Sequence, residues 1–203
     1  MQTTECMIPE DKYQDLRDSR VRPRSVFEYN VETLASMGIA EYEDADRSWK
    51  AIPENGFFLW IPPQPAGMDL YHLMSRVMFN GNHGRNGIGR QSYWNVIEVP
   101  SGPYFALNIY DGRERLGIEK EESVAGIRRS HRLAYTLLES IVHSILYPVI
   151  FTSHNLTICG SECESGRTLS LSLDQGIVKL IASLFDLPSP RSGMPSCEGR
   201  LAI

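Results

Sequence analysis

The residues best suited to bind a ligand lie in one glycine-rich segment. Residues 80–90 read NGNHGRNGIGR and combine four glycines with one histidine and two arginines. Glycines let backbone amides approach an anion, and arginines can clamp a carboxylate or a phosphate. We therefore expect Arg85 and Arg90 to bind a substrate and His83 to transfer protons. The glycine order differs from that of a dinucleotide-binding loop, and a surface loop without a ligand is the alternative.

A second cluster of polar residues lies between two expected helices. Residues 128–132 read RRSHR, in which His131 could act as a general acid or base and Arg132 could orient a substrate. Basic residues at the end of a helix also have a structural reason, because they complement the helix dipole. Glu139 closes a Thr-x-x-Glu capping box that starts at Thr136, and it is a further candidate for proton transfer.

The cysteines do not have the spacing of a metal site. Cys159 and Cys163 form one loose pair, whereas structural zinc sites show two close pairs of ligands. We therefore expect no metal. Ser161 and Cys163 are expected to contact the substrate, and the alternative for Cys163 is a buried, unreactive thiol. A nucleophilic Cys163 would need a nearby histidine, which the sequence cannot place.

Composition places the chain among ordinary globular proteins. Its 203 residues are 42% hydrophobic and 22% charged, which suits one folded domain. The net charge of −5 argues against nucleic acid as a partner, because phosphate contacts dominate such binding. Without an apolar run of about 18 to 20 residues or a leader-like start, we expect no membrane association and a cytoplasmic protein with reduced thiols. No cofactor motif is present, so no cofactor is expected.

The elements that must position these residues are predicted from periodicity and caps. About four helices are expected, at residues 25–37, 68–78, 118–127 and 136–147. Residues 1–24 are polar and charged and are expected to form an N-terminal arm or a frayed helix, before a single domain at residues 25–203.

Strands are expected where short apolar runs meet turn residues. These runs are residues 56–61, a hairpin of residues 94–99 and 104–110 around a Pro-Ser-Gly-Pro turn, and the alternating run 169–173. Residues 80–90 are expected to be a loop. Residues 177–184 fit either a partner strand after an Asp-Gln-Gly turn or an amphipathic helix.

Several short motifs in order resemble a family of uncharacterised bacterial proteins, a domain of unknown function. They are Pro103-Tyr104, Asp111-Gly112-Arg113, the box at 136–139, Gly160-Ser161-Glu162-Cys163 with Arg167, and Ser196-Cys197-Glu198-Gly199-Arg200. The resemblance covers residues 26–203. It implies that the last two apolar runs pair as strands, which favours the hairpin for residues 177–184, and it implies no known activity. The chain departs from the family between Phe185 and Met194, where the family tends to carry an aromatic and histidine-containing segment.

The sequence therefore predicts a single α+β domain with a mixed or antiparallel sheet packed by about four helices. We expect it to bind a small polar or anionic metabolite in one pocket, closed by residues 80–90 and shared with His131. As an enzyme it would use acid/base chemistry without a cofactor, and the sequence leaves open whether it is one. The alternative is a non-catalytic interaction or accessory protein, in the form of a homodimer.

Overall fold

The computed structural model describes residues 10–17, 21–54, 56–63, 68–183 and 189–203. Half of the expected arm, at residues 1–9 and 18–20, lies outside the described residues. The same holds for Leu184 at the end of the last apolar run and for residues 185–188, where the chain departs from the bacterial family.

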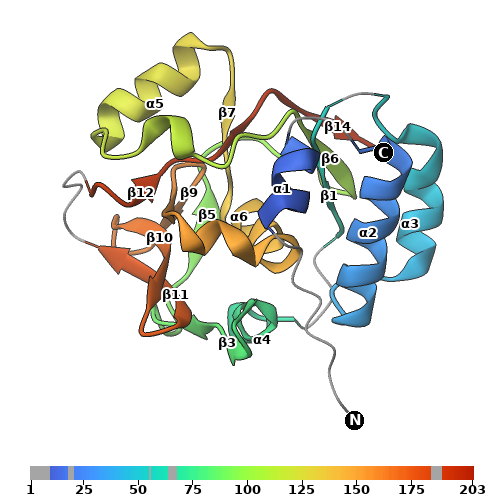
Figure 1. Ribbon diagram of the computed structural model, residues 1–203. Helices are drawn as coiled ribbons and strands as arrows, with labels where there is room; N and C mark the ends of the chain where they lie inside the picture. Colours follow the sequence, from blue (N-terminus) through green and yellow to red (C-terminus); the bar gives the residue numbers. More distant parts are fainter. Residues whose placement is uncertain (1–9, 18–20, 55, 64–67, 184–188) are drawn as a thin grey trace.

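The fold is α+β, as expected, and is organised around one central helix. Helix α6 (Leu137–Leu146) lies between two sheets (Figure 1) and contacts strands of both. The first sheet has the antiparallel order β1-β6-β14. The second has the order β12-β8-β10-β11-β4, in which the central pairs are antiparallel and the outer pairs, β12 with β8 and β4 with β11, are parallel.

The described helices include the four that were expected and two more, α1 and α3. Their bounds are α1 (Glu10–Arg17), α2 (Pro23–Ser36), α3 (Tyr42–Ser48), α4 (Leu70–Arg76), α5 (Lys120–Arg129) and α6, with short 3-10 turns η1 (Trp49–Ala51), η2 (Arg113–Arg115) and η3 (Pro148–Thr152). The strands of the two sheets are β1 (Leu59–Ile61), β4 (Arg85–Asn86), β6 (Tyr104–Leu107), β8 (Asn155–Ile158), β10 (Thr168–Asp174), β11 (Ile177–Ser183), β12 (Ser192–Gly193) and β14 (Gly199–Ala202). Three further pairs join β2 (Met78–Phe79) to β3 (Asn82–His83), β5 (Tyr93–Asn95) to β9 (Ser161–Cys163), and β7 (Leu133–Ala134) to β13 (Ser196–Cys197).

Helix α6 forms as its sequence predicts. The Thr136 hydroxyl accepts a hydrogen bond from the Glu139 amide at 3.3 Å, and the Glu139 carboxylate accepts one from the Thr136 amide at 2.7 Å, so the capping box is complete. The helix ends before Pro148, which cannot continue it. Nearly all of its residues are buried, which is expected of a helix with a sheet on each side.

Helix α2 begins two residues earlier than the expected cap at Ser25. Pro23 occupies its first turn and no side chain caps it, because the fixed backbone angle of proline already suits a helix start. Glu28 pairs with Arg24 at 3.3 Å, so the expected capping box does not form. The end of the helix is as expected, with Gly38 at a φ of +67° just beyond it.

The hairpin expected between residues 94–99 and 104–110 is absent. Strand β5 pairs instead with β9, and β6 lies between β1 and β14. Three of the four residues of β6 are buried, so this strand needs partners on both edges, and both come from distant parts of the chain. The Pro-Ser-Gly-Pro turn marks where a strand ends and does not determine its partner.

The second expected hairpin is present, and it decides the open choice for residues 177–183 in favour of a strand. Asp174 pairs with Ile177 across the two-residue loop of Gln175 and Gly176. Both loop residues have positive φ, at 50° and 77°, which is the backbone geometry of a type I′ turn and matches the twist of the strands.

The glycine-rich segment, expected to be a loop, carries the short strands β3 and β4. Two of its glycines, Gly84 and Gly87, allow the chain to pack closely against its neighbours. A Cβ at Gly84 would lie 2.6 Å from the Met74 carbonyl oxygen, and one at Gly87 would lie 2.7 Å from that of Leu180 in β11. The segment can therefore run directly against α4 and β11.

Part of the expected N-terminal arm forms helix α1 and packs against the core. Tyr13 and Leu16 of α1 are buried in the same core as the sheets and α6. Within the described residues, no helix has both the length and the apolar character needed to cross a bilayer.

Candidate ligand site

An open hollow lies between the start of α4 and the chain that follows β4. Its volume is about 770 Å³, and it is lined by residues 69–71, by Asn86 and by residues 89–93. This volume is within the range of small-molecule sites. Of the glycine-rich segment, Asn86, Gly89 and Arg90 line this hollow.

Local hydrogen bonds fix one wall of the hollow. The Gly87 amide donates to the Leu180 carbonyl at 2.8 Å, which attaches the segment to β11. The Asn86 side chain donates to the Gly89 carbonyl at 2.9 Å and accepts from the Ile88 amide at 3.0 Å. Gly89 has a φ of +69°, which turns the chain toward Arg90. The backbone before Arg90 is thus held in place by its own contacts.

The charges of the hollow are of both signs. The Arg90 side chain is exposed, and among the described residues its guanidinium has no ion-pair or hydrogen-bond partner. Asp69 accepts from the His72 amide at 2.9 Å and from His72 Nδ1 at 2.8 Å, and these bonds lower the pKa of its carboxyl. Tyr71 and Tyr93 add aromatic surface, and burial raises the pKa of Tyr93, which stays a neutral phenol. The hollow offers a free cation, an anion and two rings.

His83 and Arg85 lie near this hollow in the sequence but outside its lining. His83, in β3, is exposed and donates from Nδ1 to the Ser75 carbonyl at 2.6 Å. Arg85, in β4, is exposed opposite Lys179 of β11. Of the residues expected to bind substrate, only Arg90 lines the hollow.

The structure does not bring His131 into the same pocket. Figure 1 shows α5 and β7, which flank His131, at the top of the molecule, and α4 and β3 at the bottom. His131 is exposed at the end of α5 with a φ of +54°. The shared pocket expected from the sequence therefore does not form.

The Arg132 guanidinium binds other groups of the protein. It is buried, and its guanidinium donates to the Ser196 hydroxyl at 3.0 Å, the Ser196 carbonyl at 3.1 Å and the Asn108 carbonyl. The same group lies over the Tyr110 ring at 3.6 Å. These contacts join β13 to the chain after β6, so the role of Arg132 in the described structure is to hold the fold.

Three further candidate residues make contacts within the protein: Ser161, Cys163 and Glu139. Ser161 accepts from the Leu137 amide at 2.8 Å and donates to Asn95 at 2.7 Å, which joins the start of α6 to β5. The buried Cys163 thiol lies 3.2 Å from the Ser165 hydroxyl. Glu139 is buried and paired with Arg200. In the described part of the chain, no group of three or more His, Cys, Asp or Glu residues is placed to hold a metal.

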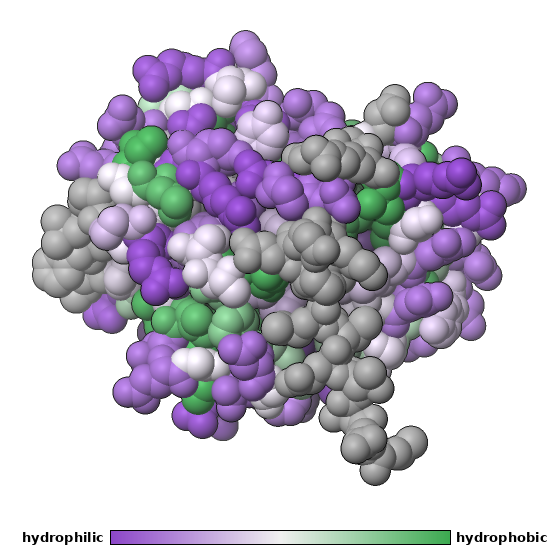
Figure 2. Space-filling model, in the orientation of Figure 1, coloured by the Kyte–Doolittle hydropathy of each residue, from purple (hydrophilic) through white to green (hydrophobic). Residues whose placement is uncertain are grey.

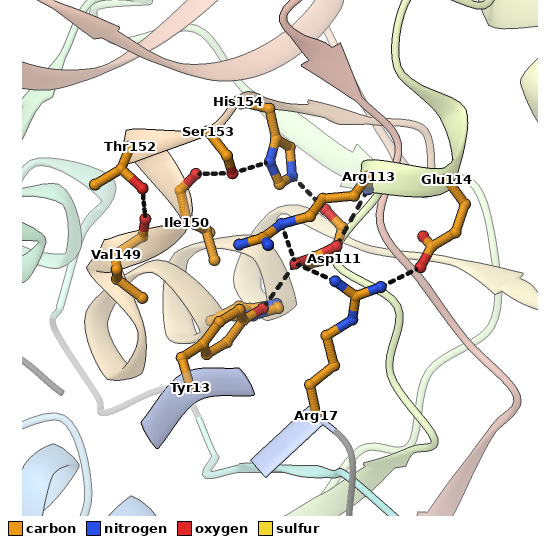
Figure 3. A network of polar contacts seen from close by, with 11 residues as sticks. Tyr13, Arg17, Asp111, Arg113, Glu114, Val149, Ile150, Thr152, Ser153 and His154 are labelled. Carbon is orange, nitrogen blue, oxygen red and sulfur yellow. Dashed lines mark hydrogen bonds and ion pairs between the residues drawn. The ribbon is translucent and has the colours of Figure 1, made fainter. Parts of the chain in front are cut away.

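A buried polar centre around Asp111 was missed by the sequence analysis. Figure 3 shows Tyr13, Arg17 and Arg113 converging on the Asp111 carboxylate. Burial alone would raise the pKa of Asp111, but the hydrogen bond from the Arg113 amide and the positive charges nearby outweigh it and lower the pKa. His154 Nε2 donates to the Asp111 carbonyl at 2.8 Å.

The sequence holds only a weak signal for this centre. Asp111-Gly112 is typical of a turn that ends a strand, and Tyr13 lies 98 residues away in a polar segment. His143 lies in the middle of an apolar helix, and that placement is the one hint that a buried polar partner is needed.

No family model matches the chain, and neither does any curated protein or solved structure. The resemblance to a bacterial family therefore stays a prediction, and function has to be argued from the geometry of the chain itself.

Proposed function

We propose that this protein binds a small polar or anionic molecule in the hollow beside Arg90. The observation that carries the proposal is the exposed Arg90 guanidinium, which has no partner among the described residues, at a hollow of about 770 Å³. A planar guanidinium without an internal partner is well suited to take a carboxylate or a phosphate in two parallel hydrogen bonds.

The lining residues support binding better than acid/base catalysis. None of His83, His131 and Glu139 is among them. Asp69 lines the hollow, but its lowered pKa keeps it ionised near neutral pH, so it cannot donate a proton and is a weaker base than an ordinary aspartate. A ligand with an anionic group toward Arg90 and a donor group toward Asp69 would satisfy both charges.

Equilibrium dialysis tests this function and can identify the ligand at the same time. The protein is dialysed against a cell extract of small molecules, and the compounds enriched on its side are identified by mass spectrometry. We expect enrichment of anionic compounds by the wild type and its loss in Arg90→Ala. Arg129→Ala removes an exposed arginine of α5 and serves as the matched control. Equal enrichment by all three proteins would contradict the proposal.

Contact with a second copy of the chain is a second candidate function, and one observation favours it. Strand β14 has β6 as its neighbour and forms an edge of its sheet in the described structure, with Leu201 and Ile203 exposed there. On the face drawn in Figure 2, the apolar side chains form small, separate patches. This limits the area that an apolar interface could use on that face. Light scattering of the wild type and Leu201→Lys distinguishes a monomer from a dimer. A wild-type dimer that Leu201→Lys abolishes would support pairing through β14. A monomeric wild type would exclude it.

A further inference from the structure

Tyr13 of α1 fills a socket in the core of the protein. Its ring is fully buried and packs edge-on against Phe57 at 5.8 Å between centroids and at a tilt against Tyr147 at 5.4 Å. Its hydroxyl lies 3.1 Å from Asp111 Oδ2 and 3.1 Å from His143 Nε2. The socket thus binds a phenol through both its ring and its oxygen.

The protons in this socket can be assigned from its geometry. An ionised Asp111 can only accept, so the single hydroxyl proton of Tyr13 points to it. His143 Nε2 must then donate to the Tyr13 oxygen. Burial lowers the pKa of His143 to about 4, so near neutral pH the ring carries one proton and Nδ1 is a bare acceptor.

Two buried polar atoms of residues close to the socket lack a partner in the described structure. His143 Nδ1 and the Tyr135 hydroxyl are buried, and neither has a hydrogen-bond partner among the described residues. The two rings are neighbours, with centroids 5.8 Å apart. A buried polar group left without a partner costs about 1–3 kcal/mol. A position that served packing alone would be better filled by apolar residues, whereas Asp111 and His143 give this socket two groups that bind a hydroxyl.

Helix α1 is a separable cover for the socket. It has eight residues, which is too short for a helix to be stable in water without docking. Tyr13 and Leu16 dock it into the core, and Arg17 lies 2.8 Å from Glu114 and 4.0 Å from the buried Asp111 carboxylate. Short elements attached in this way open at a lower free energy than the core does.

We propose that the Tyr13 socket is a ligand site that α1 occupies in the closed state, and that its ligand is a phenol. The hydroxyl of the ligand replaces that of Tyr13, donating to Asp111 and accepting from His143 Nε2, while its ring stacks on Phe57 and Tyr147. Binding then requires α1 to undock, so the free phenol competes with Tyr13.

Hydrogen exchange on the wild-type protein tests this competition. The probes are 4-methylphenol and, as the matched control without a hydroxyl, toluene at the same millimolar concentration. We expect 4-methylphenol to speed exchange of the α1 amides several-fold while the amides of α6 keep their protection, and toluene to have a much smaller effect. Unchanged exchange in α1, or equal effects of both probes, would overturn the proposal.

Two variants test the competition with Tyr13 and its independence from the hollow beside Arg90. In Tyr13→Phe the ring remains and the hydroxyl is lost, so α1 is held less firmly and 4-methylphenol should release it at a several-fold lower concentration than in the wild type. An equal or higher concentration would contradict the proposal. Arg90→Ala should leave the response to 4-methylphenol unchanged, because the socket and the hollow beside Arg90 use different residues. A negative result with 4-methylphenol would therefore overturn the socket proposal without bearing on anion binding at Arg90.

Discussion

Arg200 Nε lies 2.7 Å from Glu139 Oε1, and both side chains are almost completely buried. A second bond joins Arg200 Nη2 to Glu139 Oε2 at 2.8 Å, so the pair is bidentate. Burial alone would lower the pKa of Arg200, but the hydrogen bonds and charge of Glu139 outweigh it and raise the pKa. The pair ties the C-terminal strand β14 to the start of the central helix α6. Glu139, expected from the sequence to transfer protons, therefore has a structural role.

Replacing Glu139 should strongly destabilise the protein. Glu139→Ala leaves the Arg200 charge buried without its partner and removes the capping box of α6, so we expect a loss of about 3–5 kcal/mol in the free energy of unfolding. Glu28→Ala, which breaks the exposed pair with Arg24, should cost less than about 1 kcal/mol. Urea unfolding followed by circular dichroism measures both, and similar losses in the two variants would contradict the structural role of the buried pair.

Stability should fall as the pH drops from 6.5 toward 4. The pKa of His143 is lowered from 6.5 to about 4, first by burial and then by the charges of His154 and Arg113, against the opposing effect of Asp111. Between these values the unfolded chain binds a proton that the folded protein does not, so the loss over the whole window is roughly 3 kcal/mol. The titratable and charged groups around His143 are Tyr13 of α1, Asp111, Arg113, Tyr135, Tyr147 and His154.

Urea unfolding at pH 7.5 and pH 5.0 measures this dependence. His143→Gln should show a clearly smaller loss between the two pH values than the wild type. The control is His72→Gln, because His72 is exposed in its pair with Asp69. An equal pH dependence of the wild type and His143→Gln would show that His143 is not the group responsible.

The position of the wall beside Arg90 depends on Gly87. A Cβ at Gly87 would lie 2.7 Å from the Leu180 carbonyl oxygen, so Gly87→Ala should push the segment off β11 and cost about 1–3 kcal/mol. A Cβ at Gly102 meets nothing within 4 Å, so Gly102→Ala should be nearly neutral. Thermal unfolding compares the two. The account of the glycine-rich segment fails if Gly87→Ala is as stable as Gly102→Ala.

The sequence predicts the local features of this fold well and its long-range pairings poorly. The capping box of α6 and the turn at Gln175 and Gly176 involve neighbouring residues, so their chemistry can be read directly. The partners of β5 and β6 are set by burial against distant strands, which no local pattern contains.

The candidate site shows the same division. Arg90 was identified because an arginine among glycines is visible in the sequence, and it does line a hollow. The separation of His131 from that hollow follows from the path of the chain around α6, which residue types do not reveal. The Asp111 centre depends on Tyr13, which lies 98 positions away in the sequence, so no local pattern indicates it.

An NMR titration shows whether Arg90 binds an anion. Uniformly ¹⁵N-labelled protein is titrated with inorganic phosphate and, separately, with succinate at constant ionic strength. We predict saturable shifts of the amides of residues 69–71 and 86–93 with at least one of the two, lost in Arg90→Ala and kept in Arg129→Ala. Shifts that are absent with both probes, or that persist in Arg90→Ala, would contradict the account.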